Sequence, residues 1–302
     1  MHDTVAQLLR ALTLRPLGAR EAAGDLGASP AAETLDTFVA PSIKMPHDRV
    51  YGGQVLAQSL IAATATVPSD RPVHSMHGYF LRPGDDTRDI EYQVDRIHDG
   101  RSFSTRRTQG LQSGEPIFSM IASFQERTGG LDHSDDMPLD MPDPESLPQP
   151  EDLFSRVEHP KAHYWAVERP FDIRYINGPV YTEVTGPTVA HQAVWMRCLD
   201  RLPDNPTVHR AALAWASDYT ILEPVYRRHG IPWAIVPGLK TASLDHAMWF
   251  HRDGRADEWV LYVQESPSAQ GGRGLGLGRM FSRDGTLIAT VAQEGMIRLP
   301  EG

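Results

Sequence analysis

Apolar and polar positions follow two periods along the chain, and the change of period separates predicted helices from predicted strands. The stretch 54–66 is small and apolar on every side, which predicts a buried helix that follows Gly52-Gly53 and ends before Pro68. After it come runs that alternate or are rich in aromatic and β-branched residues, which is typical of strands. These predicted strands are 75–81, 90–95, 102–111 and 117–124.

The second half repeats this order. Residues 207–217 predict another helix, with Asn205 as N-cap and Pro206 at the first helical position. The strands predicted after it are 241–250, 259–264, 275–281 and 286–297. Landmarks recur at a nearly constant distance, since Gly272 follows Gly100 by 172 residues and Gly285 follows Gly114 by 171. The pattern indicates a duplication in which each unit is one long helix followed by an antiparallel meander. This hot-dog layout fits the order of elements better than a βαβ scheme.

Charge is distributed unevenly along the 302 residues, which hold 29 Lys and Arg against 39 Asp and Glu, a net charge of −10. This balance argues against a general nucleic-acid surface, which needs an excess of base. Eight acidic residues and no Lys or Arg lie between Asp132 and Asp152, so the rest of the chain has a net charge of only −2. The same window contains Pro138, Pro142, Pro144, Pro148 and Pro150.

Closely spaced prolines and like charges predict an extended linker. We therefore expect a first unit at 1–131, a linker at 132–165 and a second unit at 166–302. No apolar run approaches the roughly 20 residues of a membrane span. The start, Met1-His2-Asp3-Thr4, lacks the basic and apolar parts of a signal peptide, so a cytoplasmic location is expected.

Several familiar motifs fail on inspection. The run from Gly274 to Gly278 resembles a dinucleotide loop, but a strand follows it where a helix is required, and glycines that bend an edge strand are the better interpretation. No Gly-x-Ser-x-Gly elbow is present. The single Cys198 lies in an apolar strand after Trp195-Met196 and is interpreted as a buried packing thiol. Pairs of histidines are spaced by odd numbers on strands, so no metal site and no cofactor are expected.

Three short stretches carry unusual polar residues for their surroundings. Asp218 ends the second helix amid apolar neighbours, Ser243 and His246 lie in a strand of bulky apolar residues, and Gln293 falls late in an apolar strand. Each residue taken alone has an ordinary structural explanation: a helix end, a hydroxyl bonded to backbone, a satisfied histidine, a rim amide.

Taken together, longer strings resemble a known family, the type II (TesB-like) acyl-CoA thioesterases, over most of the chain from Met1 to Arg298. The most specific strings are Tyr51-Gly52-Gly53-Gln54, the run 74–85 (HSMHGYFLRPGD), the run 99–103 (DGRSF), Pro116-Ile117-Phe118, the run 122–125 (ASFQ), Ala216-Ser217-Asp218, the run 244–252 (LDHAMWFHR) and Gln293-Glu294-Gly295. The resemblance implies an α+β fold of the tandem (double) hot-dog type. It also implies hydrolysis of acyl-CoA thioesters to a free fatty acid and CoA.

In that family an Asp, a Thr or Ser, and a Gln position a water molecule, and the motifs place these roles on Asp218, Ser243 and Gln293. Thr is the commoner hydroxyl residue, so Ser243 keeps the hydroxyl and loses the methyl group that stiffens χ1. Ala122 stands in the first unit where Gln293 stands in the second, eight residues after the turn glycine. One catalytic centre per chain is therefore predicted.

The resemblance also suggests which residues meet the acyl-CoA. Candidate substrate-binding residues are Gly52, Gly53, His77, Tyr79, His246, Trp249, Arg101 and Arg273. The glycines would contribute backbone N–H groups to an oxyanion, and the arginines, with Arg106, Arg107 and Arg279, a basic patch for the CoA phosphates. A homo-oligomer, dimer or tetramer, is expected.

Two alternatives stay open. A hot-dog enoyl-CoA hydratase or dehydratase would use an Asp/His pair, for which Asp245-His246 is the local candidate. A non-catalytic acyl-CoA-binding module would lose the polar trio, whereas all three positions are polar here.

Overall fold

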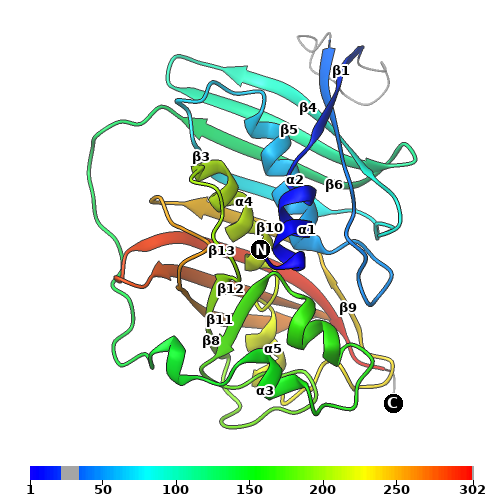
Figure 1. Cartoon of the computed structure of the whole chain (residues 1–302), viewed down its shortest axis with the longest axis vertical. Coiled ribbons are helices and arrows are strands. Elements are labelled where there is room, and N and C mark those ends of the chain that lie inside the picture. Colours follow the sequence, from blue (N-terminus) through cyan, green and yellow to red (C-terminus); the bar gives the residue numbers. More distant parts are fainter. Residues whose placement is uncertain (22–33, 301–302) are drawn as a thin grey trace.

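The computed structural model describes residues 1–21 and 34–300 as an α+β fold in which central helices are wrapped by an antiparallel sheet (Figure 1). The helices are α1 Asp3–Ala11, α2 Gly52–Thr64, α3 Pro150–Phe154, α4 Pro206–Ser217 and α5 Glu223–Arg228, with a 3₁₀ turn at Pro144–Ser146 and a π turn at Tyr164–Glu168. The strands are β1 Arg15–Glu21, β2 Thr34–Ala40, β3 Val73–Phe80, β4 Ile90–Asp99, β5 Phe103–Gln112, β6 Glu115–Gln125, β7 Phe171–Tyr175, β8 His191–Cys198, β9 Lys240–Ser243, β10 Asp245–Phe250, β11 Val260–Gln270, β12 Arg273–Ser282 and β13 Leu287–Arg298.

The described strands form one continuous sheet with the order β1-β2-β4-β5-β6-β3-β10-β13-β12-β11-β8-β7, and β9 pairs with β13. The two halves of the sheet join where β3 pairs antiparallel with β10, with His246 opposite Gly78. The first half of the sheet lies with α2 in the upper part of Figure 1, the second half lies with α5 in the lower part, and α4 lies between them against α2. The fold is a double hot-dog.

Helix α2 is buried on nearly all sides because the sheet of the first unit and helix α4 both cover it. A helix that is apolar all round needs such a core position. The two helices touch where α2 begins and α4 ends: a Cβ atom at Gly53 would lie only 2.2 Å from the carbonyl oxygen of Trp215. Glycine at this position therefore lets the two backbones approach closely.

Both predicted helices and, with one exception, the predicted strands are confirmed, with bounds that shift by a few residues. The expected order of one helix followed by a meander is corrected, because β2 precedes α2 and pairs with β4, whereas β3 pairs with β6. One strand prediction is wrong, because 241–250 is interrupted at Leu244 and forms β9 and β10. At the break, the Leu244 N–H donates to Glu294 and the Leu244 carbonyl accepts from Phe80, so the residue joins β13 to β3. Asn205 caps α4 as predicted, accepting from the Thr207 N–H at 3.0 Å. Cys198 is a buried packing thiol, and burial raises its pKa to about 11.

The glycine run in β12 is not on an edge strand, which corrects the prediction, since β12 lies between β11 and β13. Gly276 pairs with Gln293 across the sheet. A Cβ atom on Gly276 would lie 2.2 Å from the carbonyl oxygen of Ile221. The glycine thus makes room for the chain that follows Asp218, and it brings that chain against the strand that carries Gln293.

The acidic segment after β6 is more than a spacer. It runs along one side of the molecule in Figure 1 and then lies against the outer face of the second half of the sheet. Its Met137, Met141 and Leu147 pack on an apolar cluster of that face. The indole N–H of Trp195 donates to the Pro142 carbonyl at 2.9 Å, and that of Trp259 to Glu145 at 3.0 Å.

The acids of this segment also have basic partners in the second unit. Asp132 pairs with Arg252, Asp135 with Arg279, and Asp143 and Glu145 with Arg283. The expectation that like charges simply keep the segment extended is corrected by these contacts.

Candidate active site

The candidate site forms where helix α4 ends. The last carbonyl groups of a helix have no partner within it and need one outside. Here the Tyr51 hydroxyl donates to the Trp215 carbonyl at 2.9 Å, and the Tyr262 hydroxyl to the Ser217 carbonyl at 3.1 Å. These bonds hold the last turn of α4, and Asp218 is its C-cap.

Three donors converge on the Asp218 carboxylate. Oδ1 accepts from Gln293 Nε2 at 2.9 Å and from the Ser243 hydroxyl at 3.3 Å, and Oδ2 accepts from the backbone N–H of Gly53 at 2.9 Å. Gln293 Nε2 also lies 3.0 Å from Ser243 Oγ. The three residues predicted to act together are therefore in contact, and the first unit contributes Gly53 to the same group.

The Asp218 carboxyl is poised to exchange a proton near neutral pH. Burial raises its pKa to about 6, while the hydrogen bonds from Gln293, Gly53 and Ser243 act in the opposite direction. These three donors are neutral, so desolvation outweighs them. A carboxylate with such a pKa is a suitable general base at physiological pH.

A second row of polar groups lies behind Gln293. His246 Nδ1 is 2.5 Å from Gln293 Oε1, and His246 Nε2 is 3.0 Å from the Ser217 hydroxyl. His246 and Gln293 are each 1% exposed. In this structure the ring of His246 contacts Gln293 and Ser217, and the expectation that it binds substrate directly stays a prediction.

Known proteins resemble the chain over nearly its whole length. A family model described as "Acyl-CoA thioesterase" matches residues 165–296, and one described as "Acyl-CoA thioesterase N-terminal domain" matches 40–125. Acyl-CoA thioesterase 2 of Haemophilus influenzae is 37% identical over 270 residues, covering 87% of this chain and 93% of that protein. The chain belongs to the acyl-CoA thioesterase family.

Other acyl-CoA thioesterases agree with this assignment. Mouse acyl-coenzyme A thioesterase 8 is 39% identical over 263 residues, which cover 83% of this chain and 81% of that protein. The crystal structure of the acyl-CoA thioesterase II TesB2 from Mycobacterium marinum has a TM-score of 0.75 and 38% identity, and covers 98% of this chain and 99% of that one. The chain is accordingly a thioester hydrolase.

Some predicted substrate-binding residues of this thioesterase lie on the wrong side of the sheet for the site. Side chains alternate between the two faces of a strand, and His246, opposite Gly78, faces the helices. His77, Tyr79 and Trp249 stand at odd distances from this pair, so they lie on the outer face, where Tyr79 is 63% exposed. The thickness of the sheet separates them from Asp218, so the structure does not bring them together with the polar trio, and their contact with the acyl-CoA stays a prediction.

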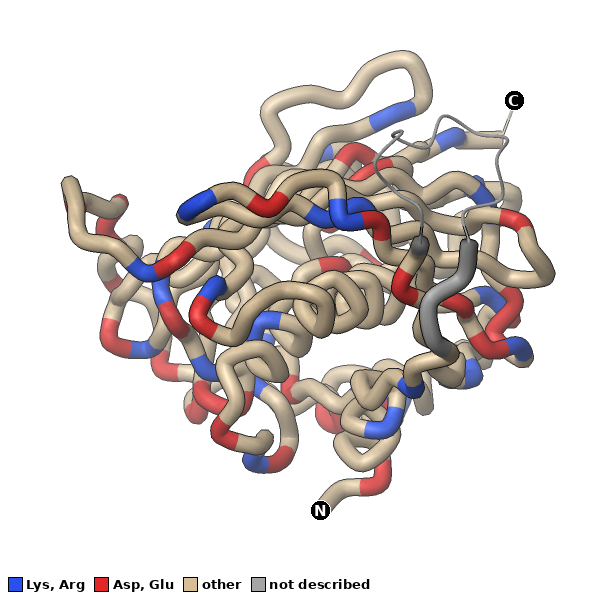
Figure 2. Tube along the Cα trace, turned by 90° about the horizontal axis from the view of Figure 1, so that it is seen from above, with Lys and Arg blue, Asp and Glu red and all other residues tan. Residues whose placement is uncertain are grey.

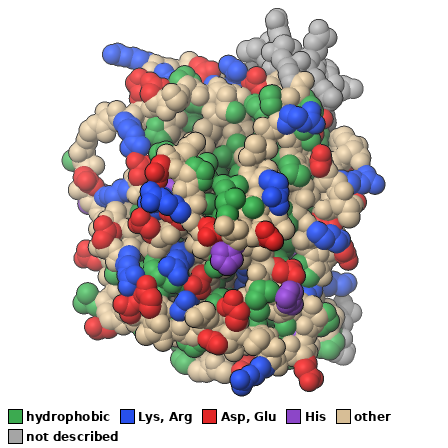
Figure 3. Space-filling model, in the orientation of Figure 1, with side chains coloured by type: hydrophobic (Ala, Val, Ile, Leu, Met, Phe, Trp, Pro, Cys, Tyr) green, Lys and Arg blue, Asp and Glu red, His purple; other side chains and the backbone are tan. Residues whose placement is uncertain are grey.

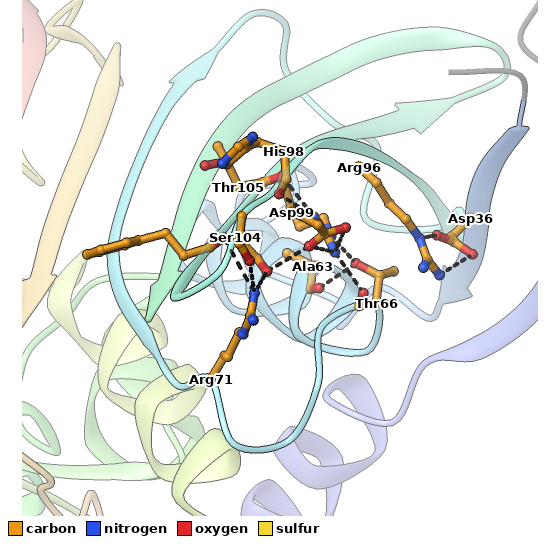
Figure 4. Close-up of polar contacts among 12 residues, drawn as sticks. Asp36, Ala63, Thr66, Arg71, Arg96, His98, Asp99, Ser104 and Thr105 are labelled. Atoms are coloured by element: carbon orange, nitrogen blue, oxygen red, sulfur yellow. Dashed lines mark hydrogen bonds and ion pairs between the residues drawn. The ribbon is translucent and has the colours of Figure 1, made fainter. Parts of the chain in front are cut away.

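The predicted basic patch is largely engaged within the thioesterase itself. Arg106 is 1% exposed and donates to Asp99 and to Thr66, just after α2 ends. Figure 4 shows this cluster, in which Arg71 reaches the backbone of the turn that contains Arg101. The turn lies at the carboxyl end of α2, about 20 Å along the helix from Gly53. Arg106 is a structural residue.

The remaining arginines are paired or dispersed. Arg107 pairs with Asp95, Arg279 with Asp135, and Arg273 with Glu294. Acidic and basic residues are interspersed along the chain in Figure 2, and the face in Figure 3 has the same mixture around a central group of apolar side chains. Among residues 1–21 and 34–300, no three His, Cys, Asp or Glu side chains cluster as they would around a metal ion. None of the described helices is both long and apolar enough to cross a bilayer.

Sequence reasoning missed Tyr51 and Ser217 as parts of this site. Tyr51 precedes α2 at the N-cap, a position that usually has Ser, Thr, Asp or Asn, and it makes no capping bond there. A long helix without a capping side chain is the signal that another group caps it. That group is Asp218, from the other unit.

Proposed function

We propose that the chain hydrolyses fatty acyl-CoA thioesters with a water molecule activated by Asp218, and that Ser243 and Gln293 orient this water. The convergence of both side chains and of the Gly53 N–H on one buried carboxylate carries the proposal. Asp218, with a pKa of about 6, is ionised at pH 7 and can accept a proton.

In the proposed reaction the water oxygen attacks the thioester carbonyl carbon while Asp218 takes one of its protons. The C–O bond forms and the carbonyl becomes an oxyanion. When the intermediate collapses, the C–S bond breaks, and the departing thiolate takes the proton back from Asp218. The products are a carboxylic acid and free CoA, so the atoms and charges balance without a cofactor.

In this proposal the N-terminus of α2 stabilises the oxyanion. Helix N-termini favour negative charge because their first N–H groups have no partner within the helix. The N–H of Gly53 is already bonded to Asp218, which leaves the neighbouring amide of Gly52 and the positive end of the helix for this task.

Substitution of Asp218 tests the assignment. Asp218→Asn should lower kcat by about 10²–10⁴, because a general base contributes a factor of this size. Release of free thiol from acyl-CoA substrates of several chain lengths measures the rate. A kcat near that of the wild type would remove Asp218 as the base.

Asp245→Asn is the matched control, since Asp245 Oδ1 accepts from the Glu294 N–H at 2.7 Å and an amide oxygen can replace it. This variant should keep the wild-type rate. Two results together would support the hydratase alternative: loss of activity in Asp245→Asn, and hydration of an enoyl-CoA double bond by the wild-type enzyme. Acyl-CoA binding without any thiol release would favour the non-catalytic module.

No covalent intermediate forms in the proposed reaction. Ser243 donates to Asp218 at 3.3 Å and accepts from the Gln293 amide at 3.0 Å, so in this proposal its hydroxyl is a positioning group, and the Asp218 base takes its proton from the water molecule. Mass spectrometry of enzyme quenched during turnover should detect no acyl group on Ser243. An acylated Ser243 peptide would overturn this part of the proposal.

We also propose that the chain forms a homo-oligomer through the outer face of the central strands. Tyr79, Ile121 and Trp249 lie exposed there on β3, β6 and β10. Apolar side chains grouped on a sheet face favour association, and light scattering measures the state. The cytoplasmic location expected from the sequence stays a prediction.

A further inference from the structure

Gln293 can assist Asp218 only if its amide group faces one way. The two ends of an amide differ, since NH₂ donates and oxygen accepts. The NH₂ must face Asp218 and Ser243, because an ionised carboxylate only accepts hydrogen bonds. A side-chain amide can rotate by 180°, so something must select this orientation.

The contact on the opposite side of Gln293 supplies the selection. Oε1 of Gln293 lies 2.5 Å from Nδ1 of His246. Since Oε1 is an acceptor, Nδ1 has to carry the hydrogen, and Nε2 of the neutral ring is then an acceptor. The single hydrogen of the Ser217 hydroxyl turns to Nε2, 3.0 Å away, from the Ala214 carbonyl at 2.8 Å. Burial lowers the pKa of His246 to about 4, which keeps the ring neutral at pH 7.

We propose that His246 is a positioning residue that holds the Gln293 amide with its NH₂ toward Asp218, through the tautomer that carries hydrogen on Nδ1. The inference rests on the proposed function of Asp218 and Gln293.

The other tautomer shows what the ring prevents. With hydrogen on Nε2, the ring donates to Ser217, and the Ser217 hydroxyl donates to the Ala214 carbonyl at 2.8 Å. Nδ1 becomes an acceptor and draws the NH₂ of Gln293 toward itself. Oε1 of the rotated amide then faces Oδ1 of Asp218, an oxygen against an anionic oxygen. An ionised Asp218 therefore favours the first tautomer, so the charge of the base and the hydrogen of the ring are coupled.

The first unit contains an internal comparison. Ala122 stands where Gln293 stands in the second unit, and the residue that faces Ala122 across β3 and β6 is Met76. Met76 precedes His246 by 170 residues, close to the spacing of the other repeated landmarks. The amide and the imidazole are therefore both replaced by apolar residues in the same unit, as expected of two side chains that act as a pair.

Two substitutions of His246 separate positioning from packing. The amide nitrogen of Asn can take the place of Nδ1, whereas that of Gln lies closer to the place of Nε2. His246→Gln should lower kcat about 10²-fold with little change in KM, because a misplaced group loses rate rather than binding. In the wild type the hydrogen bond from Gln293 lowers the pKa of Asp218. Because His246→Gln weakens this bond, the pKa of Asp218 should rise, and the acid limb of the pH profile of kcat/KM should move to higher pH. His246→Asn should restore kcat to within about tenfold and return the limb.

A double-mutant cycle tests whether His246 acts through Gln293. In a Gln293→Ala background, His246→Gln should cause no further loss, whereas multiplied losses would overturn the inference. A wild-type rate for Gln293→Ala alone would instead overturn the proposed function. His209→Gln is the matched control, because His209 is a buried histidine bonded to the Ala256 N–H, away from Asp218. It should leave the acid limb in place.

The ring can also be observed in the wild-type enzyme. Nitrogen-15 NMR of histidine-labelled protein, with His246→Asn to identify the signal, should show a neutral ring with hydrogen on Nδ1. Hydrogen on Nε2 would overturn the inference whether or not the variants fold.

Discussion

Asp218 combines a chemical requirement with a cost in stability. In the folded protein three neutral hydrogen-bond donors replace the water around its carboxylate. The loss of solvation raises the pKa more than these hydrogen bonds lower it. The resulting pKa suits a base at neutral pH but makes the charged form less favourable in the folded protein than in the unfolded chain. The residue is thus a place where function and stability oppose each other.

This opposition predicts a pH dependence of unfolding. The pKa of Asp218 rises from 3.8 to about 6 on folding, so the folded state binds the proton more tightly and stability falls as the pH rises between these values. The Asp218→Asn variant lacks this proton. We therefore expect the free energy of unfolding of the variant, measured in urea, to increase relative to that of the wild type as the pH rises from 4 to 7, by up to about 3 kcal/mol. Parallel curves for the two proteins would show that Asp218 has an ordinary pKa.

At the scale of elements, close approach of backbones places the catalytic groups. The chain after Asp218 packs on β12 because Gly276 leaves the space, and α2 meets α4 because Gly53 does. Both glycines serve the position of one carboxylate. They were visible in the sequence, but a glycine does not reveal which segment approaches it.

Gly276→Ala should therefore disturb the site as well as the fold. The added Cβ would meet the Ile221 carbonyl at 2.2 Å, and this carbonyl lies three residues after Asp218, so we expect a shift of this backbone to disturb the carboxylate. We expect a loss of about 1–3 kcal/mol in unfolding free energy and a lower kcat. Gly129→Ala is the control, because nothing lies within 4 Å of that position, and it should change neither quantity. Equal behaviour of the two variants would contradict this role of Gly276.

The sequence predicted α2, α4 and the strands that follow them well because each carries a clear pattern over many residues. It did not predict α1, α3, α5 or the strands that precede the two long helices. It failed at β9 and β10, where Leu244 bonds to strands on both sides, a tertiary contact that leaves no local pattern. The polar trio was predicted from motifs, and its members do meet. The contacts of Gly53 and Tyr51 could not be predicted, since they join segments more than 160 residues apart.

On the scale of the whole molecule, the acidic segment covers part of the outer sheet face of the second unit instead of only connecting the two units. Its partners Arg279 and Arg283 are exposed, and such surface pairs each contribute little. The apolar contacts of Met137, Met141 and Leu147 with the outer sheet therefore stabilise the attachment more than the ion pairs do. The segment thus protects an apolar face of the second unit from water.

Leu147→Ala should accordingly cost about 1–2 kcal/mol of unfolding free energy, because it removes methyl groups from a partly buried contact. The control is Leu139→Ala in the same segment, where the side chain is 85% exposed and the change should be within about 0.5 kcal/mol. Urea unfolding measures both. If high salt destabilised the protein more than Leu147→Ala did, the ion pairs would be the main attachment instead.

The bond from Gly53 to Asp218 has a consequence for the order of events during synthesis. The base, the hydroxyl and the amide lie at residues 218, 243 and 293, while the capping N–H is at 53. A nascent chain therefore has no competent site until residue 293 has left the ribosome. The first unit by itself lacks the Asp218 cap at the start of α2, and β13 contributes both Gln293 and the strand that joins β10 to β12.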